Sequence, residues 1–226
     1  MLFGPLIILA LLFRTICFES FNTPSSAMIP TFVVGDYFFV SKSSYGYSRF
    51  SLPIGLPLFS GRIFTSRGPE RGDVAVFRLP TDTSVNYIKR VVGLPGDSIQ
   101  MLHGNLFING QVVPRRQVED YTYQEGARVV LMHQYVESLP RGPGKSLDHL
   151  IVKVGDDGPL NDTPVYTVPA GDYFVLGDSR DNSQDSRVMS AVGFVPAENF
   201  VGRAAFIFYS ASGTHIRSDR ILKAVR

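Results

Sequence analysis

The stretch VNYIKRVVGLPGD (residues 85–97) has the composition of a β-strand that ends in a turn. Valine, isoleucine and tyrosine favour strands, and a Pro-Gly pair favours a turn. Short apolar runs of the same kind, bounded by Gly-Asp, Pro-Gly or Asn-Gly, follow one another along most of the chain after residue 30. Asn109-Gly110, between two of these runs, is typical of a two-residue β-hairpin. The strands predicted in this way cover residues 37–42, 74–79, 85–94, 106–108, 111–113, 172–178 and 203–210.

These strands and turns predict a mostly β, antiparallel fold with an insertion in its middle. Residues 114–168 are richer in Pro, Gly and charged residues than the segments on either side. We therefore expect a β core formed by residues 19–100 and 169–226, which carries a less regular inserted β subdomain at residues 101–168. The apolar segment SRFSLPIGLPLFSGR (48–62) is either a loop folded on the core or a surface that touches lipid or substrate, and both interpretations stay open.

The composition limits the partners and cofactors that the protein can have. The formal net charge is +2 and the basic residues are scattered, which is not typical of a nucleic-acid-binding protein. The only cysteine is Cys17, so no disulfide can form within the chain. The four histidines lack the spacing of metal ligands, and no phosphate-binding or redox motif is present. We therefore expect no nucleic-acid partner, no metal and no cofactor.

The N-terminal segment LFGPLIILALLF (2–13) is apolar and is followed by Arg14. A membrane-spanning helix needs about 20 mostly apolar residues. This segment is slightly short, but an arginine near its end can reach the membrane surface with its long side chain. A signal peptide cut after Ala27 is an alternative, although no basic residue precedes the apolar run. A buried helix of a soluble protein is a third interpretation. We expect a retained single-pass anchor at residues 1–18.

Lys89 lies inside an otherwise apolar predicted strand. Alternation along the strand places Lys89 on the same face as Tyr87 and Val91, with Ile88 and Arg90 on the other. A lysine on a half-buried face either extends its ammonium to solvent or becomes buried. Burial disfavours the charged form and lowers the pKa, and a neutral amine is a competent general base for a serine hydroxyl. The sequence of this strand alone leaves both interpretations open.

The segment GDSRDNSQDSR (177–187) is the most polar in the chain. On its own, this composition is typical of a solvated turn. The segment is, however, one of four segments whose order and sequence resemble the type I (leader) signal peptidases, in the bacterial membrane-bound form. These segments are PSSAMIPTFVVGDYFFV (24–40), RGDVAVF (71–77), YIKRVVGLPGD (87–97), and GDSRDNSQDSR (177–187) with GFVP (193–196).

The resemblance implies a catalytic role for three residues. Lys89 matches the family's general base. Ser25 matches the serine whose hydroxyl helps to form the oxyanion hole, and Ser183 matches the serine that orients the lysine. The β core would then be the catalytic domain, and its reaction would use a Ser/Lys dyad.

Four further residues match supporting positions of the family. Asp185 and Arg187 match charged residues that brace the active-site region. Arg90 matches the basic neighbour of the lysine, for which we expect a structural role. Met28 matches a residue that the family inserts toward the membrane.

The nucleophilic serine of the family falls on Ala27. One explanation is an engineered replacement that silences the enzyme, and another is a natural inactive homologue. In a third, Ser26 has taken over the attack. If the segment is extended, however, neighbouring side chains point in opposite directions, which would aim the Ser26 hydroxyl away from Lys89. We consider a silenced serine-to-alanine form the most economical explanation.

The resemblance therefore implies a membrane-anchored serine endopeptidase that removes signal peptides from exported preproteins after a small-x-small motif. Its partners would be signal peptides and membrane phospholipid, and it would be a monomer. Its place would be the bacterial cytoplasmic (inner) membrane, with the catalytic domain on the periplasmic face. A naturally inactive signal-peptide-binding homologue and a dedicated maturation peptidase of a conjugation or secretion system are the alternatives.

Overall fold

The computed structural model describes residues 17–51, 61–64, 67–125 and 128–225. Its largest sheet has eight strands and joins parts of the chain that are distant in sequence. The strands lie in the order β1-β2-β16-β5-β6-β14-β15, with β17 paired to β16, and all these pairings are antiparallel. Their bounds are β1 (Phe18–Asn22), β2 (Asp36–Ser41), β5 (Val74–Leu79), β6 (Asp82–Gly93), β14 (Asp172–Leu176), β15 (Val195–Pro196), β16 (Phe200–Ser212) and β17 (His215–Ile216).

The predicted hairpin belongs to a four-stranded sheet. Asn109 and Gly110 have φ angles of 53° and 74°, as the predicted two-residue turn requires, and Ile108 pairs with Gln111 across it. This confirms the hairpin. The sheet has the order β13-β7-β8-β9, with β7 (Ser98–Leu102), β8 (Asn105–Ile108), β9 (Gln111–Val112) and β13 (Tyr166–Thr167). The remaining short elements are β3 (Tyr47–Ser48), β4 (Arg62–Ile63) and the 3₁₀ helices η1 (Arg49–Ser51), η3 (Ala197–Asn199) and η4 (Ser218–Arg220).

The middle of the chain is more regular than expected, so the expectation is wrong for residues 115–125 and 128–153 but holds for residues 154–165, which form no strand. This part of the chain contains a three-stranded antiparallel sheet made of β10 (Arg115–Glu125), β11 (Arg128–Pro140) and β12 (Ser146–Lys153). The glycines that suggested irregularity include Gly142 and Gly144, which both have positive φ in the short turn between β11 and β12. Composition averaged over the segment therefore hid long strands joined by a tight turn.

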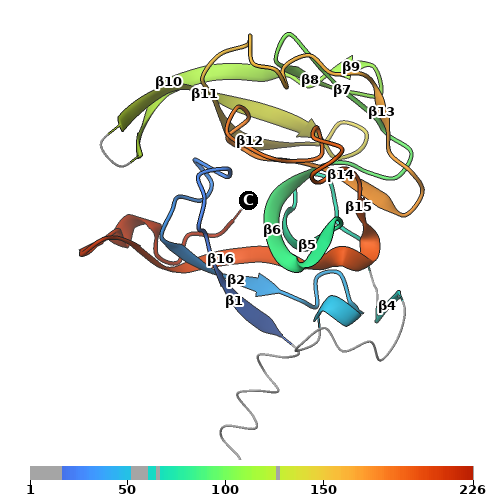
Figure 1. The fold of residues 1–226 in the computed structure, drawn as a ribbon, viewed down its shortest axis with the longest axis horizontal. Helices are drawn as coiled ribbons and strands as arrows, with labels where there is room; N and C mark the ends of the chain where they lie inside the picture. Colours follow the sequence, from blue (N-terminus) through green and yellow to red (C-terminus); the bar gives the residue numbers. More distant parts are fainter. Residues whose placement is uncertain (1–16, 52–60, 65–66, 126–127, 226) are drawn as a thin grey trace, which may run out of the picture.

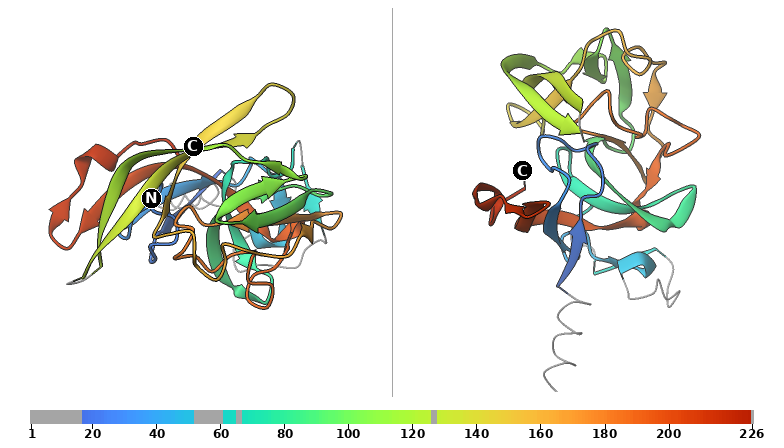
Figure 2. Two further views of the ribbon diagram at one scale, coloured as in Figure 1. Left: turned by 90° about the horizontal axis from the view of Figure 1, so that it is seen from above. Right: turned by 60° about the vertical axis from the view of Figure 1, so that its left-hand side comes forward.

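The three-stranded and four-stranded sheets lie at one end of the molecule, and β1, β2 and β16 lie toward the other (Figure 1). A second direction of view shows the same arrangement (Figure 2). Strand β6, which carries Lys89, lies between these two ends (Figure 1). The antiparallel, mostly β fold expected from the sequence is thus confirmed, whereas the proposed boundaries at residues 100 and 169 stay a prediction.

Strand β6 alternates as its sequence predicts. Tyr87 and Val91 pack against one group of core residues, whereas Ile88 and Val92 pack against two others. Predicted strand 74–79 coincides with β5, and the other predicted strands each overlap an observed one. Strand β6 therefore has apolar packing on both faces, so a charged group on it needs a buried partner.

The expected anchor at residues 1–18 lies outside the described residues except for its last two positions, and Phe18 already begins β1. Within the part of the chain that the structure describes, no helix has the length and apolar character needed to cross a membrane. Most of the apolar segment 48–62 is also outside the described residues, which resume at residue 61.

Candidate active site

Three segments that are distant in sequence line one groove of about 370 Å³. The first is the turn that carries Ala27, the second is the exposed part of β6, and the third is the polar loop, the name used here for residues 177–187. The groove brings Lys89 and Ala27 together, as the sequence predicts. Its lining residues are Pro24, Ser25, Ser26, Ala27, Val85, Asn86, Tyr87, Ile88, Lys89, Asn182 and Gln184.

The segment around Ala27 is a turn, so the extended backbone that would aim the Ser26 hydroxyl away from Lys89 is not formed. The Ile29 N–H donates to the carbonyl of Ser26 (3.2 Å), and the Phe32 N–H donates to the carbonyl of Met28 (2.8 Å). The carbonyl of Ala27 accepts a hydrogen bond of 3.1 Å from the Ser179 N–H. The polar loop thus fixes the backbone at position 27.

Ser26 and Ser25 have different surroundings in the groove. The Ser26 side chain is buried, and its Oγ accepts a hydrogen bond of 2.6 Å from Asn182 Nδ2. Ser25 is exposed. The Ser26 hydroxyl is therefore held by the polar loop, which supplies a reason against its use as a nucleophile that does not depend on an extended backbone.

Lys89 is buried and does not extend its ammonium to solvent. Only 4% of the residue is exposed, and its Nζ donates to the carbonyl of Ile88 (3.1 Å) and lies 5.1 Å from the centre of the Tyr87 ring. Burial lowers the pKa of Lys89 from 10.5 to about 8, although the negative charges of Asp185 and Asp178 act in the opposite direction. A substantial fraction of neutral amine is therefore present near pH 8.

Gly177 lets Ser183 and the Ala27 backbone approach each other. A Cβ atom at Gly177 would lie 2.2 Å from Ser183 Oγ and 2.7 Å from the Ala27 carbonyl oxygen, so no side chain fits there. Ser183 Oγ is buried and has no partner in hydrogen-bond geometry among the described residues, although it is near enough to Asp185 to help lower the pKa of that carboxyl. Ser183 is thus close to the groove, but its expected hydrogen bond to Lys89 is not formed in the structure.

Asp185 and Arg187 form an ion pair inside the polar loop. Arg187 Nε and Nη2 donate to the two oxygens of Asp185 at 2.8 and 2.9 Å, and the Gly177 N–H donates to the same carboxylate at 3.0 Å. Burial by itself raises the pKa of Asp185, but the charge and hydrogen bonds of Arg187 outweigh it and lower the pKa. The pair therefore stays charged and shapes the loop from within.

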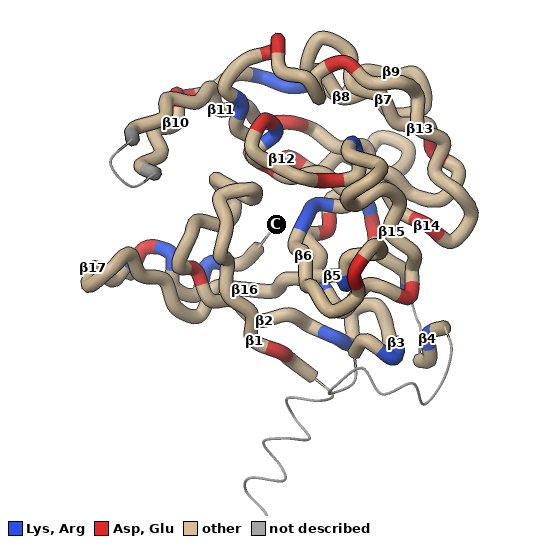
Figure 3. The backbone as a smooth tube through the Cα atoms, in the orientation of Figure 1, with Lys and Arg blue, Asp and Glu red and all other residues tan. Residues whose placement is uncertain are grey.

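Arg90 faces away from the groove and connects its three segments. Its Nε and Nη2 donate to the two carboxylate oxygens of Asp178 (2.8 and 2.7 Å), and its Nη1 donates to the Gly72 carbonyl (2.7 Å). The Thr31 hydroxyl donates to the same Asp178 carboxylate at 2.5 Å. Figure 3 shows acidic and basic positions close to one another around β6. These contacts support the structural role that was expected for Arg90.

Comparison with known proteins identifies the family of this chain. The family model described as signal peptidase, peptidase S26, matches residues 1–209. The chain belongs to this family. It is 44% identical over 221 residues to a signal peptidase I of Rickettsia conorii (96% of this chain, 81% of that protein). It is 45% identical over 208 residues to one of Rickettsia akari (90% and 76%). A solved signal peptidase I from Enterococcus faecalis is 25% identical, with a TM-score of 0.34 over 61% of this chain and 97% of that one.

In this member of the peptidase S26 family, the expected role of Met28 at the membrane is wrong. Met28 is only 1% exposed and belongs to the apolar core together with Phe32 and Phe38. The turn at residues 25–32 directs this side chain into the core, where its burial stabilises the turn. Met28 is therefore not accessible to lipid.

The sequence did not single out several residues in and around this groove. Tyr87 donates its hydroxyl to Gln184 Oε1 (3.0 Å) and thereby joins β6 to the polar loop. Asn182 and Gln184 were not singled out either, although both lie in the polar segment 177–187. Glu137, which forms a buried ion pair with Arg180, gave no sequence signal because it lies on β11, far from the loop in sequence.

Replacing Lys89 with methionine is expected to stabilise the folded protein by about 3 kcal/mol at pH 7, because the buried amine is harder to protonate than the unfolded one. The folded pKa is about 8 and the reference value is 10.5, so the unfolded state binds more protons between these pH values. The wild-type stability therefore rises with pH in this window, and the advantage of Lys89→Met should disappear above it. Denaturant unfolding from pH 7 to 11 measures this difference. The exposed Lys145→Met is the control, and a pH-independent difference for Lys89→Met would contradict the burial argument.

Proposed function

We propose that this chain has the groove of a signal peptidase I-type serine endopeptidase, and that Ala27 stands where the nucleophile of a Ser/Lys dyad belongs. The substrate would be the signal peptide of an exported preprotein, bound with a small-x-small motif. The observation that carries the proposal is the buried amine of Lys89, with a pKa of about 8, in the same groove as Ala27. A lysine in this state can accept a proton near neutral pH without a histidine.

With serine at position 27, the reaction would proceed in two steps. The serine Oγ attacks the scissile carbonyl carbon while its proton passes to Lys89 Nζ. Lys89 then returns this proton to the leaving amine, which breaks the peptide bond and leaves an acyl-enzyme. A water molecule then gives a proton to Lys89 Nζ while its oxygen bonds to the acyl carbon. The ester bond breaks, and Lys89 returns the proton to the serine Oγ.

The surrounding residues would assist these steps. The N–H of residue 27 and the hydroxyl of Ser25 would stabilise the oxyanion, and the loss of one such donor typically costs about 3 kcal/mol of barrier. Ser183 would orient Lys89, for which it needs a rotation or a small shift from the position described above. Alanine at position 27 removes the attacking oxygen but keeps the N–H, so peptide binding is expected to survive.

We further propose that the protein acts at the bacterial inner membrane as a monomer, held by the apolar N-terminal segment that precedes β1, with phospholipid beside the groove and the catalytic face toward the periplasm. The proposed catalytic core comprises residues 19–100 and 169–226, and residues 101–168 form the inserted subdomain. Support comes from the apolar sequence of the N-terminal segment and from the family.

Peptide binding by the chain as it stands tests this function without a need for catalysis. A fluorescent signal peptide with an Ala-x-Ala site should bind in micelles that contain phospholipid. The same peptide with Leu-x-Leu should bind about tenfold or more weakly, because shallow pockets reject the extra methylene groups. Equal binding of the two peptides, or of a scrambled peptide, would contradict the proposed groove.

Ala27 also favours a second function, that of a naturally inactive protein which holds signal peptides without cleaving them. This alternative predicts the same selective binding. It differs from the first in what happens when serine is installed at position 27, because a natural binding protein need not retain the rest of the catalytic geometry. A dedicated maturation peptidase would instead cleave one of several unrelated preproteins and leave the others intact.

A further inference from the structure

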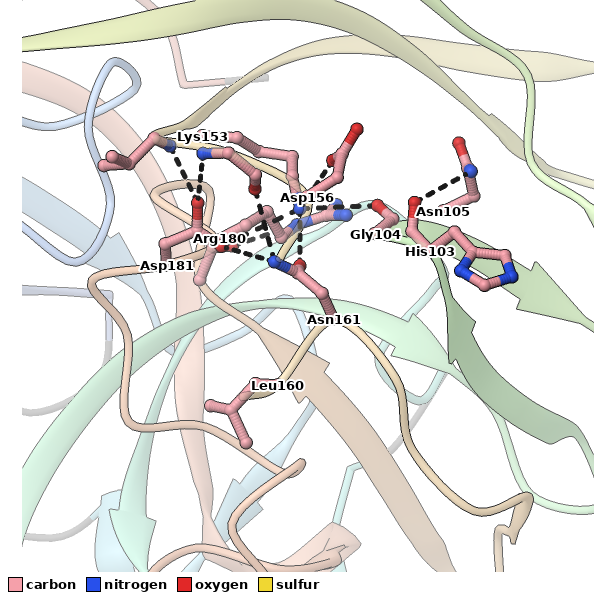
Figure 4. Close-up of polar contacts among 12 residues, drawn as sticks. His103, Gly104, Asn105, Lys153, Asp156, Leu160, Asn161, Arg180 and Asp181 are labelled. Carbon is pink, nitrogen blue, oxygen red and sulfur yellow. Dashed lines mark hydrogen bonds and ion pairs between the residues drawn. The ribbon is translucent and has the colours of Figure 1, made fainter. Parts of the chain in front are cut away.

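Another buried lysine, Lys153, contacts the polar loop away from the groove. Lys153 ends β12, and its side chain is only 1% exposed. It lies in the cluster of polar contacts shown in Figure 4, together with Asp156, Asn161 and Asp181. None of these residues lines the groove. The reaction proposed above does not use this cluster, so the buried ammonium of Lys153 has a different role.

Oxygen atoms surround the ammonium of Lys153. Its Nζ donates to Asn161 Oδ1 at 2.5 Å and to the Gly104 carbonyl at 3.5 Å, and it lies 3.4 Å from Asp156 Oδ1 and 3.7 Å from Asp181 Oδ1. The approach is close, because a Cβ atom at Gly104 would lie 2.8 Å from the same Nζ. The ammonium thus joins the buried Asn161 to the carboxylates of Asp156 and Asp181, whose side chains are 44% and 17% exposed. Its removal would leave the buried Asn161 Oδ1 without this donor.

Asp181 is the partner that belongs to the polar loop. Its Oδ2 accepts hydrogen bonds from the N–H groups of Val154 (2.7 Å) and Gly155 (3.2 Å), which directly follow the lysine. Its Oδ1 faces Lys153 and also accepts a bond from Asn161 Nδ2 at 3.4 Å. The carboxylate of Asp181 is thus fixed to the end of β12 on both of its oxygens.

The neighbours of Asp181 in the loop reach the groove. Asn182, the next residue, donates to Ser26 Oγ at 2.6 Å. Ser179, two residues before Asp181, donates its N–H to the Ala27 carbonyl at 3.1 Å. A continuous set of contacts therefore leads from Lys153 through Asp181 to the turn that carries Ala27.

Lys42 provides a comparison within the same molecule. It is also buried, at 3% exposure, and it pairs with Glu19 (2.8 Å) and donates to the Ser51 carbonyl (2.7 Å). Both partners lie outside the polar loop and outside the groove. Lys42 therefore represents a buried lysine whose loss should affect stability alone.

We propose that Lys153 is a positioning residue for the groove, which holds the polar loop through Asp181 at the place where Asn182 and Ser183 meet the turn of Ala27. The proposal rests on the proposed function only where cleavage is measured, because the geometry of the groove can be followed without catalysis. Its consequence is that the inserted part of the chain, through β12, sets the shape of the peptide-binding site.

The first test measures the titration of Lys89 in the chain as it stands, by NMR of protein labelled at the lysine side chains. Lys153→Met should loosen the polar loop and admit water to Lys89, so that the pKa of its amine rises from about 8 toward 10.5. Lys42→Met should lower the melting temperature and leave this pKa in place. If Lys153→Met and Lys42→Met both leave the pKa of Lys89 unchanged, Lys153 is a structural residue only and the proposal is overturned.

A second variant covers the case in which Lys153→Met does not fold. Asp181→Asn keeps the size of the side chain and an oxygen for the Val154 N–H, but it removes the charge that faces Lys153. It should raise the pKa of Lys89 in the same direction by a smaller amount and weaken binding of the Ala-x-Ala peptide. An unchanged pKa and unchanged binding in a folded Asp181→Asn protein would also overturn the proposal.

The last measurement adds Lys153→Met to the Ala27→Ser protein. We expect kcat to fall by about tenfold to a hundredfold, since a misplacement of about 1 Å can cost a factor of this size. Exposed Lys145→Met serves as the matched control and should leave kcat unchanged. If Ala27→Ser alone shows no cleavage, the proposed function fails, and the titration of Lys89 still decides the role of Lys153. If Ala27→Ser is active and Lys153→Met does not alter kcat, the positioning role is overturned.

Discussion

Installing serine at position 27 should raise cleavage of an Ala-x-Ala peptide by about 10⁴-fold or more, because the loss of a catalytic nucleophile costs a serine peptidase a factor of at least this size. The backbone of the turn is already held by the Ser179 N–H, and Lys89 lies in the same groove. The rate should rise with pH through about 8 and then level off, since the amine of Lys89 accepts a proton only when it is neutral. A fluorogenic peptide assayed from pH 6 to 10 in detergent with phospholipid measures both effects.

Two controls make the result specific to the proposed pair. Adding Lys89→Met to Ala27→Ser should abolish the gain, whereas adding Ser26→Ala should leave most of it, because the Ser26 hydroxyl is bonded to Asn182. Absence of cleavage by Ala27→Ser would favour the naturally inactive binding protein. A rate that does not change between pH 7 and 9 would show that Lys89 is not the base.

Local signals in the sequence predicted much of the core of this fold. The Asn109-Gly110 turn and the alternation of β6 depend on neighbouring residues, which sequence shows directly. The long strands β10 and β11 escaped prediction because composition was averaged over residues 114–168, which mixes them with the Pro- and Gly-rich turn at residues 140–144 and the polar segment 154–164. The inward direction of Met28 escaped because it depends on a turn whose hydrogen bonds are visible only in three dimensions.

At the site, too, some features could be predicted from the sequence and others depend on tertiary contacts. The resemblance of four segments predicted that Ala27 and Lys89 would lie together, and the structure places them in one groove. The strand sequence could not decide whether Lys89 is buried, because that depends on how the polar loop and the turn of Ala27 pack against β6. The same is true of Arg90, since its partner Asp178 lies 88 positions away in the sequence. Pairs of this kind leave no local pattern.

Replacing Arg90 with methionine should lower the free energy of unfolding by about 3–5 kcal/mol, since it leaves the buried carboxylate of Asp178 without its cation. Both side chains are only 1% exposed, so solvent cannot take over the lost contacts. In a chain of this length the melting temperature should fall by about 10 °C, which differential scanning calorimetry measures directly. Exposed Arg203→Met, which removes a guanidinium 3.9 Å from Asp73, is the matched control and should change little.

The same ion pair offers a test of whether the penalty comes from the unpaired charge. Adding Asp178→Asn to Arg90→Met removes that charge and should recover part of the lost stability, although the amide still needs the Thr31 hydroxyl and other neighbours as partners. If the double variant is as unstable as the sum of the two single variants, the penalty comes from the lost packing of the arginine side chain. Because Arg90 joins β6 to the polar loop and to the turn of Ala27, the single variant should also lose binding of the Ala-x-Ala peptide well below its melting temperature.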